Sequence, residues 1–125
     1  MTTHTALICD DDRLIAAVAK LVLKQKGFTV LEASEGRTGL ELILRERPRL
    51  VLLDLNMPDT DGRAVLRALQ SAEYDASHIV VLSGEESDSV DGEVRALGAH
   101  ESMRKPFNPM ELGKRIDALL KDWSA

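Results

Sequence analysis

The sequence contains one cysteine, no long apolar run and no dense cluster of basic residues. The lone Cys9 cannot form an internal disulfide and stands in a strand-like apolar run, so we interpret it as a buried structural thiol. A net charge of −5 without a Lys/Arg run argues against direct binding of nucleic acid. The apolar runs are far too short to cross a bilayer, and residues 1–4 lack a charged start. We therefore expect a cytoplasmic protein that is not inserted in a membrane.

The sequence also lacks internal repeats, low-complexity stretches and any linker that would lead to a second domain. Its 125 residues suit one domain, which at this length buries about two thirds of the surface of the unfolded chain. A hydrophobic fraction of 44% is enough for a packed core, and 30% charged residues favour solubility. We expect a single domain over residues 1–125.

Short apolar runs alternate with helical patterns along the whole chain, which is typical of βα units around a parallel sheet. Strands are expected at residues 5–9, 28–33, 50–53, 79–82 and 99–103. Helices are expected at residues 13–26, 36–47, 62–70 and 88–97, and from residue 109 to about residue 123. The run 50–53 is apolar throughout, as expected of a strand that is covered on both faces. The sequence therefore predicts an α/β fold of the (βα)5 kind, with a single five-stranded parallel sheet and helices on both faces.

Helix boundaries carry local signals of different strength. Asn108 is a good N-cap for the last helix, and Asp12 is interpreted as the cap of the first. The helix at residues 88–97 is the least convincing, because Gly92 in its interior costs about 1 kcal/mol relative to alanine.

Polar residues with complementary chemistry follow four of the predicted strands. Asp54 comes directly after the run 50–53, and Asp10 and Asp11 follow the first strand. Ser83 follows the strand at 79–82, and Lys105 follows the last strand. Because the carboxyl ends of parallel strands meet at one edge of a sheet, these side chains are expected to converge there. Two acids, a hydroxyl and a lysine around Asp54 indicate a site for a metal ion and a phosphoryl group.

Asp54 alone is a poor nucleophile towards phosphorus, because carboxylate and phosphoryl group are both anionic. A divalent cation that bridges them removes this repulsion, and Mg²⁺ prefers hard oxygen ligands. Asp10, Asp11 and the backbone carbonyl of Asn56 can supply such oxygens beside Asp54. The product of phosphoryl transfer would be an acyl phosphate, and no general base is needed since the carboxylate is already ionised.

Charge on the three phosphoryl oxygens would then be shared among the metal, the Lys105 ammonium and the Ser83 hydroxyl. Each of these residues also has an ordinary structural interpretation, since an Asp after a strand is more often a turn or a helix cap. The histidines show no metal-ligand spacing, and we interpret them as scattered surface residues: His4, His78 and His100.

Taken together, these residues resemble the receiver domains of two-component response regulators, over essentially the entire chain. The matching motifs are Asp10-Asp11, Asp54-x-x-Met57-Pro58-x-x-Asp61-Gly62, Ser83-Gly84 and Lys105-Pro106-Phe107. The resemblance implies a flavodoxin-like sheet with strand order 2-1-3-4-5. It also implies a cis peptide bond between Lys105 and Pro106, which is often found in such domains.

The resemblance further implies a phosphoacceptor signalling switch in a phosphorelay. A sensor histidine kinase or phosphotransfer protein would supply phosphohistidine, and the receiver would move the phosphoryl group to Asp54 with Mg²⁺ or Mn²⁺. Asp11, Asp54 and the Asn56 carbonyl would bind the metal, and Asp10 would reach it through water. Hydrolysis resets the switch, so the chain is not a turnover enzyme, and Asn56 and Glu85 would tune the lifetime of the phosphoryl group.

Phosphorylation in this family draws the hydroxyl at the Ser83 position inward and reshapes the face formed by the last two helices and the last strand. That face would control a downstream protein target or form a homodimer. Receivers usually carry Tyr or Phe three residues before the lysine, whereas this chain has Ser102. Output would then run through Ser83 and the helix at 88–97, through Met103, or through a different surface.

Two other functions remain open from the sequence. A phosphorylation-independent interaction module on the same fold gains slight support from Ser102, although no residue of the site is missing. A metal-dependent phosphatase comes last, because the position two residues after the nucleophile is Asn56 where such enzymes need an acid. We expect no output domain in this chain. The sequence does not distinguish a stand-alone receiver from a fragment of a longer protein.

Overall fold

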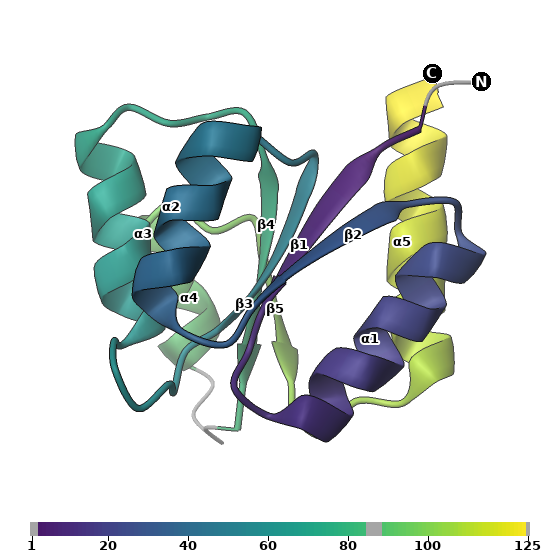
Figure 1. Cartoon of the computed structure of the whole chain (residues 1–125), viewed down its shortest axis with the longest axis horizontal. Helices are drawn as coiled ribbons and strands as arrows, with labels where there is room; N and C mark the ends of the chain where they lie inside the picture. Colours follow the sequence, from purple (N-terminus) through teal and green to yellow (C-terminus); the bar gives the residue numbers. More distant parts are fainter. Residues whose placement is uncertain (1–2, 85–88, 125) are drawn as a thin grey trace.

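The computed structural model describes residues 3–84 and 89–124. Within them, five strands alternate with five helices and form a single parallel sheet of order β2-β1-β3-β4-β5 (Figure 1). The strands are β1 Thr5–Cys9, β2 Thr29–Ala33, β3 Leu50–Asp54, β4 His78–Ser83 and β5 Glu101–Arg104. The helices are α1 Arg13–Gln25, α2 Gly36–Glu46, α3 Gly62–Ser71, α4 Ser89–Ala96 and α5 Pro109–Ser124. The predicted α/β fold and its strand order are confirmed.

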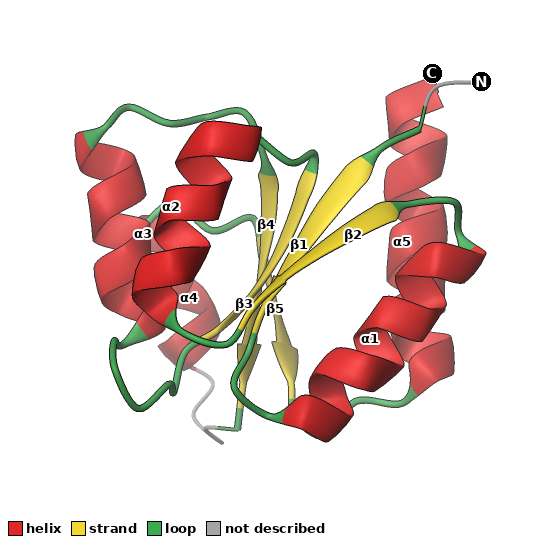
Figure 2. Cartoon of the chain, viewed as in Figure 1, coloured by secondary structure: helices red, strands yellow, loops and turns green. Residues whose placement is uncertain are grey.

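The helices cover the sheet on both faces, with α2, α3 and α4 on one side and α1 and α5 on the other (Figure 2). Successive strand residues point to opposite faces, so each central strand contributes to both layers. In β3, Val51 and Leu53 pack in the α2–α3–α4 layer, whereas Leu50 and Leu52 pack in the α1–α5 layer. This explains why β3 is apolar at every position before Asp54.

Two strands begin later than the sequence pattern predicts. Gly27 and Gly98 adopt positive φ angles of 92° and 101°. The residue after each glycine donates its backbone N–H to a carbonyl of the preceding helix. The Phe28 N–H donates to the Leu23 carbonyl, and the Ala99 N–H donates to the Val94 carbonyl. This is the glycine-based C-terminal motif of helices, which occupies backbone groups that a strand would use. The predicted strand starts at residues 28 and 99 were therefore wrong, although both side chains are buried.

Three strands end one residue later than expected, because Asp54, Ser83 and Arg104 are the last residues of β3, β4 and β5. The predicted helix start at residue 88 lies outside the described residues, and the described part of α4 ends at Ala96. The predicted caps are confirmed: Asp12 accepts from the Leu14 and Ile15 N–H groups, and Asn108 accepts from the Glu111 N–H.

The histidines are not all isolated, which corrects the prediction. The rings of His78 and His100 stack with centroids 4.7 Å apart, since one begins β4 and the other directly precedes the neighbouring β5. His78 also contacts Glu101. In residues 3–84 and 89–124, no helix combines the length and apolar character needed to cross a membrane.

Candidate functional site

The polar residues singled out in the sequence meet at the carboxyl edge of the sheet. Asp54 ends the central strand β3, whose neighbours are β1 and β4. Asp10 and Asp11 follow β1, and Ser83 ends β4. Lys105 follows β5, and its N–H donates to the Ser83 carbonyl at 2.7 Å. The strand order therefore places Asp54 between the acidic pair on one side and Ser83 on the other.

Three carboxylates form the centre of the site. Asp10, Asp11 and Asp54 each offer an oxygen, and these atoms lie within 4.8 Å of one another. Asp10 and Asp54 are only 1% and 2% exposed, whereas Asp11 is open to solvent. Backbone groups fix the two buried side chains, because the Asp12 N–H donates to Asp10 Oδ1 and the Asn56 N–H donates to Asp54 Oδ1. Backbone hydrogen bonds thus hold the two buried carboxylates in place.

Lys105 reaches into this group. Its Nζ lies 2.8 Å from Asp10 Oδ2 and 3.1 Å from Asp54 Oδ1. Burial alone lowers the pKa of Lys105, but the attraction of the Asp10 carboxylate and then of Asp54 outweighs burial, so the pKa is raised. The ammonium is therefore firmly protonated. The Lys105–Pro106 peptide bond is cis, as the resemblance predicted.

The electrostatics of Asp54 are dominated by its burial. Removal from water, together with the charge of Asp10, raises the pKa of Asp54 from 3.8 to about 6. The hydrogen bond from the Asn56 N–H and the nearby Lys105 oppose this rise. At neutral pH the carboxylate is ionised but poorly solvated, which is a reactive state for an oxygen nucleophile.

The donor set fits a hard divalent cation. Three carboxylates face one ammonium, which leaves an excess of negative charge in a largely buried site. Asp10 Oδ2 is buried and accepts no hydrogen bond of normal geometry among the described residues, although Lys105 lies close to it. Asp11 and Asn56 also line one surface cavity of about 350 Å³. Oxygen ligands of this kind suit Mg²⁺ or Mn²⁺.

Two further residues were named from the sequence, Ser102 and Glu85. Ser102 lies on β5, and its hydroxyl donates to Asp91 Oδ1 on α4 at 2.6 Å. Glu85 lies outside the described residues. Sequence reasoning missed Asp59, which bonds the start of α2 from 23 residues away. No local pattern signals that contact, since it depends on how the β3–α3 loop folds back.

Comparisons with known proteins agree with this geometry. The response regulator receiver domain family matches residues 6–117. The cell cycle transcriptional regulator CtrA of Caulobacter vibrioides is 38% identical over 117 residues, which cover 92% of this chain and 49% of CtrA. The transcriptional regulatory protein CpxR of Escherichia coli is 38% identical over 120 residues, which cover 94% of this chain and 50% of CpxR. The chain thus spans about half the length of these curated relatives.

Solved structures give the same result. The chemotaxis response regulator CheY4 of Vibrio cholerae superposes with a TM-score of 0.84 at 30% identity, covering 94% of this chain and 98% of CheY4. The receiver domain of a LuxO repressor protein from Vibrio parahaemolyticus superposes with a TM-score of 0.88, and at 23% identity this likeness concerns the fold alone. The match over residues 6–117, together with the sheet order and the carboxylate site, shows that the chain belongs to the response regulator receiver domain family of two-component systems.

Proposed function

We propose that this chain is a phosphoacceptor switch that takes a phosphoryl group from a phosphohistidine onto Asp54 with the help of Mg²⁺. The donor would be a sensor histidine kinase or a phosphotransfer protein of a phosphorelay. The observation that carries the proposal is the environment of Asp54: a carboxylate only 2% exposed, with the Lys105 ammonium 3.1 Å away and two further carboxylates beside it.

In the proposed transfer, an Asp54 carboxylate oxygen forms a bond to phosphorus as the phosphorus–nitrogen bond of phosphohistidine breaks. The imidazole leaves with the bonding electrons and takes up a proton. A bound Mg²⁺ would supply charge that screens the carboxylate from the phosphoryl oxygens. Asp11, Asp54 and the Asn56 carbonyl would hold it directly, and Asp10 would do so through water.

The other side chains stabilise charge and position. Lys105 would exchange its contact with Asp54 for a phosphoryl oxygen while it keeps Asp10, because both contacts come from the same Nζ. Ser83 is 3% exposed at the end of β4, within the same edge, and would donate its hydroxyl to another oxygen. No general base is required, since the pKa of about 6 leaves Asp54 ionised at neutral pH.

The chain would act as a switch and not as a turnover enzyme. Hydrolysis of the acyl phosphate would end the signal, with Asn56 and Glu85 setting its lifetime. The α4–β5–α5 face would carry the signal to a downstream protein in the cytoplasm or to a second copy of the chain. Direct contact with nucleic acid is not expected from a net charge of −5.

The test is chemical trapping of the phosphorylated residue. The protein is incubated with Mg²⁺ and a small acyl phosphate donor, then reduced with borohydride, which converts an aspartyl phosphate into homoserine. Peptide mass spectrometry should find homoserine at position 54 in the wild type, and none with Asp54→Ala or with a chelator. Wild-type protein that acquires no homoserine, or acquires it elsewhere, contradicts the proposal.

A phosphorylation-independent interaction module is the second candidate. It is favoured by the Ser102–Asp91 hydrogen bond, which ties β5 to α4 without an aromatic side chain that could move. If the trapping experiment fails while a partner still binds, this second function replaces the first.

A further inference from the structure

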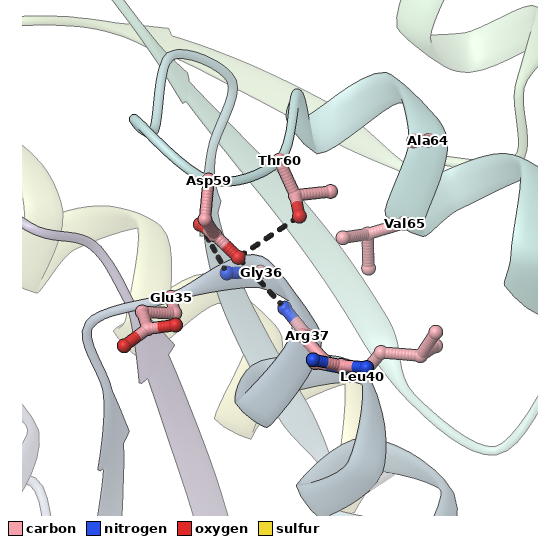
Figure 3. Close-up of a pocket in the computed structure, with 8 residues that line it drawn as sticks. All are labelled: Glu35, Gly36, Arg37, Leu40, Asp59, Thr60, Ala64 and Val65. Atoms are coloured by element: carbon pink, nitrogen blue, oxygen red, sulfur yellow. Dashed lines mark hydrogen bonds between the residues drawn. The ribbon is translucent and has the colours of Figure 1, made fainter.

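The loop between β3 and α3, residues 55–61, is fixed at its base. The Gly62 N–H donates to the Leu55 carbonyl at 2.8 Å, and Asn56 and Asp61 form an isolated antiparallel bridge. A Cβ at Gly62 would lie 2.5 Å from the Asp54 carbonyl oxygen, so the loop can close this tightly only with glycine. From this base the loop projects towards α2 (Figure 3).

The tip of the loop is attached to the start of α2 by Asp59. Its Oδ1 accepts from the Gly36 N–H at 3.0 Å, and its Oδ2 accepts from the Arg37 N–H at 3.4 Å (Figure 3). Thr60 also donates its hydroxyl to Asp59 Oδ2. The residue at the N-cap position of α2, Glu35, makes no side-chain capping bond. Asp59 therefore supplies from another loop the capping that helices usually receive from their own flanking residue.

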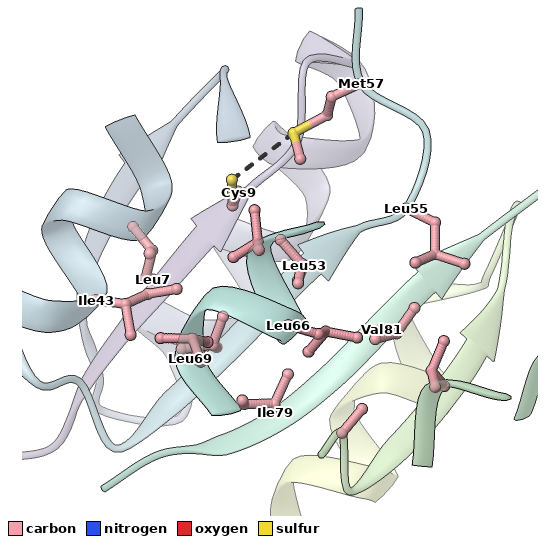
Figure 4. Close-up of a cluster of buried hydrophobic side chains, with 14 of the residues drawn as sticks. Leu7, Cys9, Ile43, Leu53, Leu55, Met57, Leu66, Leu69, Ile79 and Val81 are labelled. Carbon is pink, nitrogen blue, oxygen red and sulfur yellow. Dashed lines mark hydrogen bonds between the residues drawn. The ribbon is translucent and has the colours of Figure 1, made fainter. Parts of the chain in front are cut away.

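The two segments are also packed closely together. A Cβ at Gly36 would lie 2.7 Å from the Thr60 Cβ, which leaves no room for a larger residue there. Earlier in the loop, Met57 is 7% exposed, and its sulfur accepts a hydrogen bond from Cys9 Sγ at 3.7 Å (Figure 4). Movement of the α2 start relative to the loop would thus disturb the residues that follow Asn56.

We propose that Asp59 is a positioning residue for the metal site: by capping α2 it holds the loop so that the Asn56 backbone stays at the cavity shared with Asp11. The capping bonds involve the tip, the Cys9–Met57 contact involves the residue after Asn56, and Gly62 closes the base. Asp59 itself is exposed and would not touch the ion. This role rests on the proposed function only in that Asn56 is taken as a metal ligand.

The experiment compares three variants of the full chain. Asp59→Ala removes both capping oxygens, and Asp59→Asn removes the charge but keeps one acceptor. Asn108→Ala removes an ordinary N-cap from α5, which covers the opposite face of the sheet from α2, and is the matched control for loss of a cap. The readouts are amide hydrogen exchange without metal and Mg²⁺ affinity by calorimetry, at a temperature where all variants are folded.

Asp59→Ala should speed exchange at the Gly36 and Asn56 amides in metal-free protein. It should also raise the dissociation constant for Mg²⁺ about tenfold, the lower end of the effect of residues that orient metal ligands. Asp59→Asn should retain most of the wild-type affinity. Asn108→Ala should lower the midpoint of thermal unfolding and leave Mg²⁺ affinity unchanged.

Unchanged Mg²⁺ affinity in Asp59→Ala, or unchanged exchange at Asn56, overturns the positioning role and leaves the proposed function intact. Equal losses in Asp59→Asn and Asp59→Ala also overturn it, because the effect would then come from charge and not from the hydrogen bonds. If the wild type itself binds no Mg²⁺, the proposed function fails and the positioning role fails with it.

Discussion

The Ser102 hydroxyl on β5 donates a 2.6 Å hydrogen bond to Asp91 on α4, at the position where receiver domains usually carry an aromatic ring. Ser102 lowers the pKa of Asp91 by this bond, with further help from Arg95. The Ser102 carbonyl also accepts from the Arg115 guanidinium on α5. Polar contacts thus connect α4, β5 and α5 at the position where the resemblance predicted an aromatic ring.

Loss of this hydroxyl should loosen α4. Ser102→Ala leaves Asp91 with Arg95 as its partner, so we expect only a small drop in the urea midpoint but clearly faster hydrogen exchange at Val90 and Val94. Ser102→Thr keeps a hydroxyl and should behave like the wild type. Equal exchange in the alanine and threonine variants would mean that the bond does not hold α4 to β5.

Neutralising Asp54 should stabilise the protein. Its pKa is raised from 3.8 to about 6 in the folded chain, so the folded state binds the proton more tightly than the unfolded state. Stability contributed by this proton is present below about pH 4 and is lost as pH rises through about 6, amounting to at most about 3 kcal/mol. Asp54→Asn should therefore unfold at higher urea concentration than the wild type at pH 8, and the gap should close towards pH 4.

Added Mg²⁺ gives the control for this prediction. The cation should stabilise the wild type and narrow its difference from Asp54→Asn at pH 8, because ligand binding to the folded state raises stability. If Asp54→Asn is less stable than the wild type at pH 8 without metal, the proposed effect of burial on Asp54 is contradicted.

Removing Lys105 should destabilise the protein, because two buried carboxylates lose their nearby cation. Lys105→Ala leaves Asp10 and Asp54 without their cation, and we expect a loss of about 3 kcal/mol at pH 8 without metal. At pH 5 the loss should be smaller, since Asp54 with a pKa of about 6 is then mostly protonated. The variant should still bind Mg²⁺ but fail to switch. Lys114→Ala, at an exposed position on α5, should change neither property.

Two glycines offer a matched pair of substitutions with opposite outcomes. Gly62→Ala places a Cβ 2.5 Å from the Asp54 carbonyl oxygen and should cost about 2 kcal/mol or more, with loss of Mg²⁺ binding as the loop shifts. Gly92 lies within α4, where an added Cβ meets nothing within 4 Å, so Gly92→Ala should stabilise by about 1 kcal/mol. Urea unfolding measures both, and a stabilising Gly62→Ala would contradict the loop geometry.

Sequence patterns predicted the elements whose signals are local. The apolar run before Asp54 predicted a strand that is covered on both faces, and the position of Asp54 after that run placed it at the carboxyl edge of the sheet with Lys105. The strand starts failed at Phe28 and Ala99, since both residues look strand-like but their N–H groups close the preceding helix. The sequence pattern does not indicate whether such an N–H group donates to the preceding helix or to a neighbouring strand.

Contacts between distant segments could not be predicted from sequence patterns, for a different reason. Asp59 and Gly36 are 23 residues apart, and Ser102 and Asp91 belong to different elements, so neither pair leaves a periodic trace. The stacking of His78 on His100 likewise follows from the alignment of β4 and β5 at their amino ends. Such pairs are set by how the elements pack against one another.

The most direct test of the central claim is an amide NMR titration with Mg²⁺ and beryllofluoride, a phosphoryl mimic, on the wild type and Asp54→Ala. In the wild type, signals of Asp11, Ser83 and Lys105 should shift, and the shifts should vanish in the variant. Spread of the shifts into α4 and β5 would mean that switching operates with Ser102 in place of an aromatic. Wild-type spectra that do not respond, or equal shifts in Asp54→Ala, would contradict the assignment of Asp54 as the phosphoacceptor.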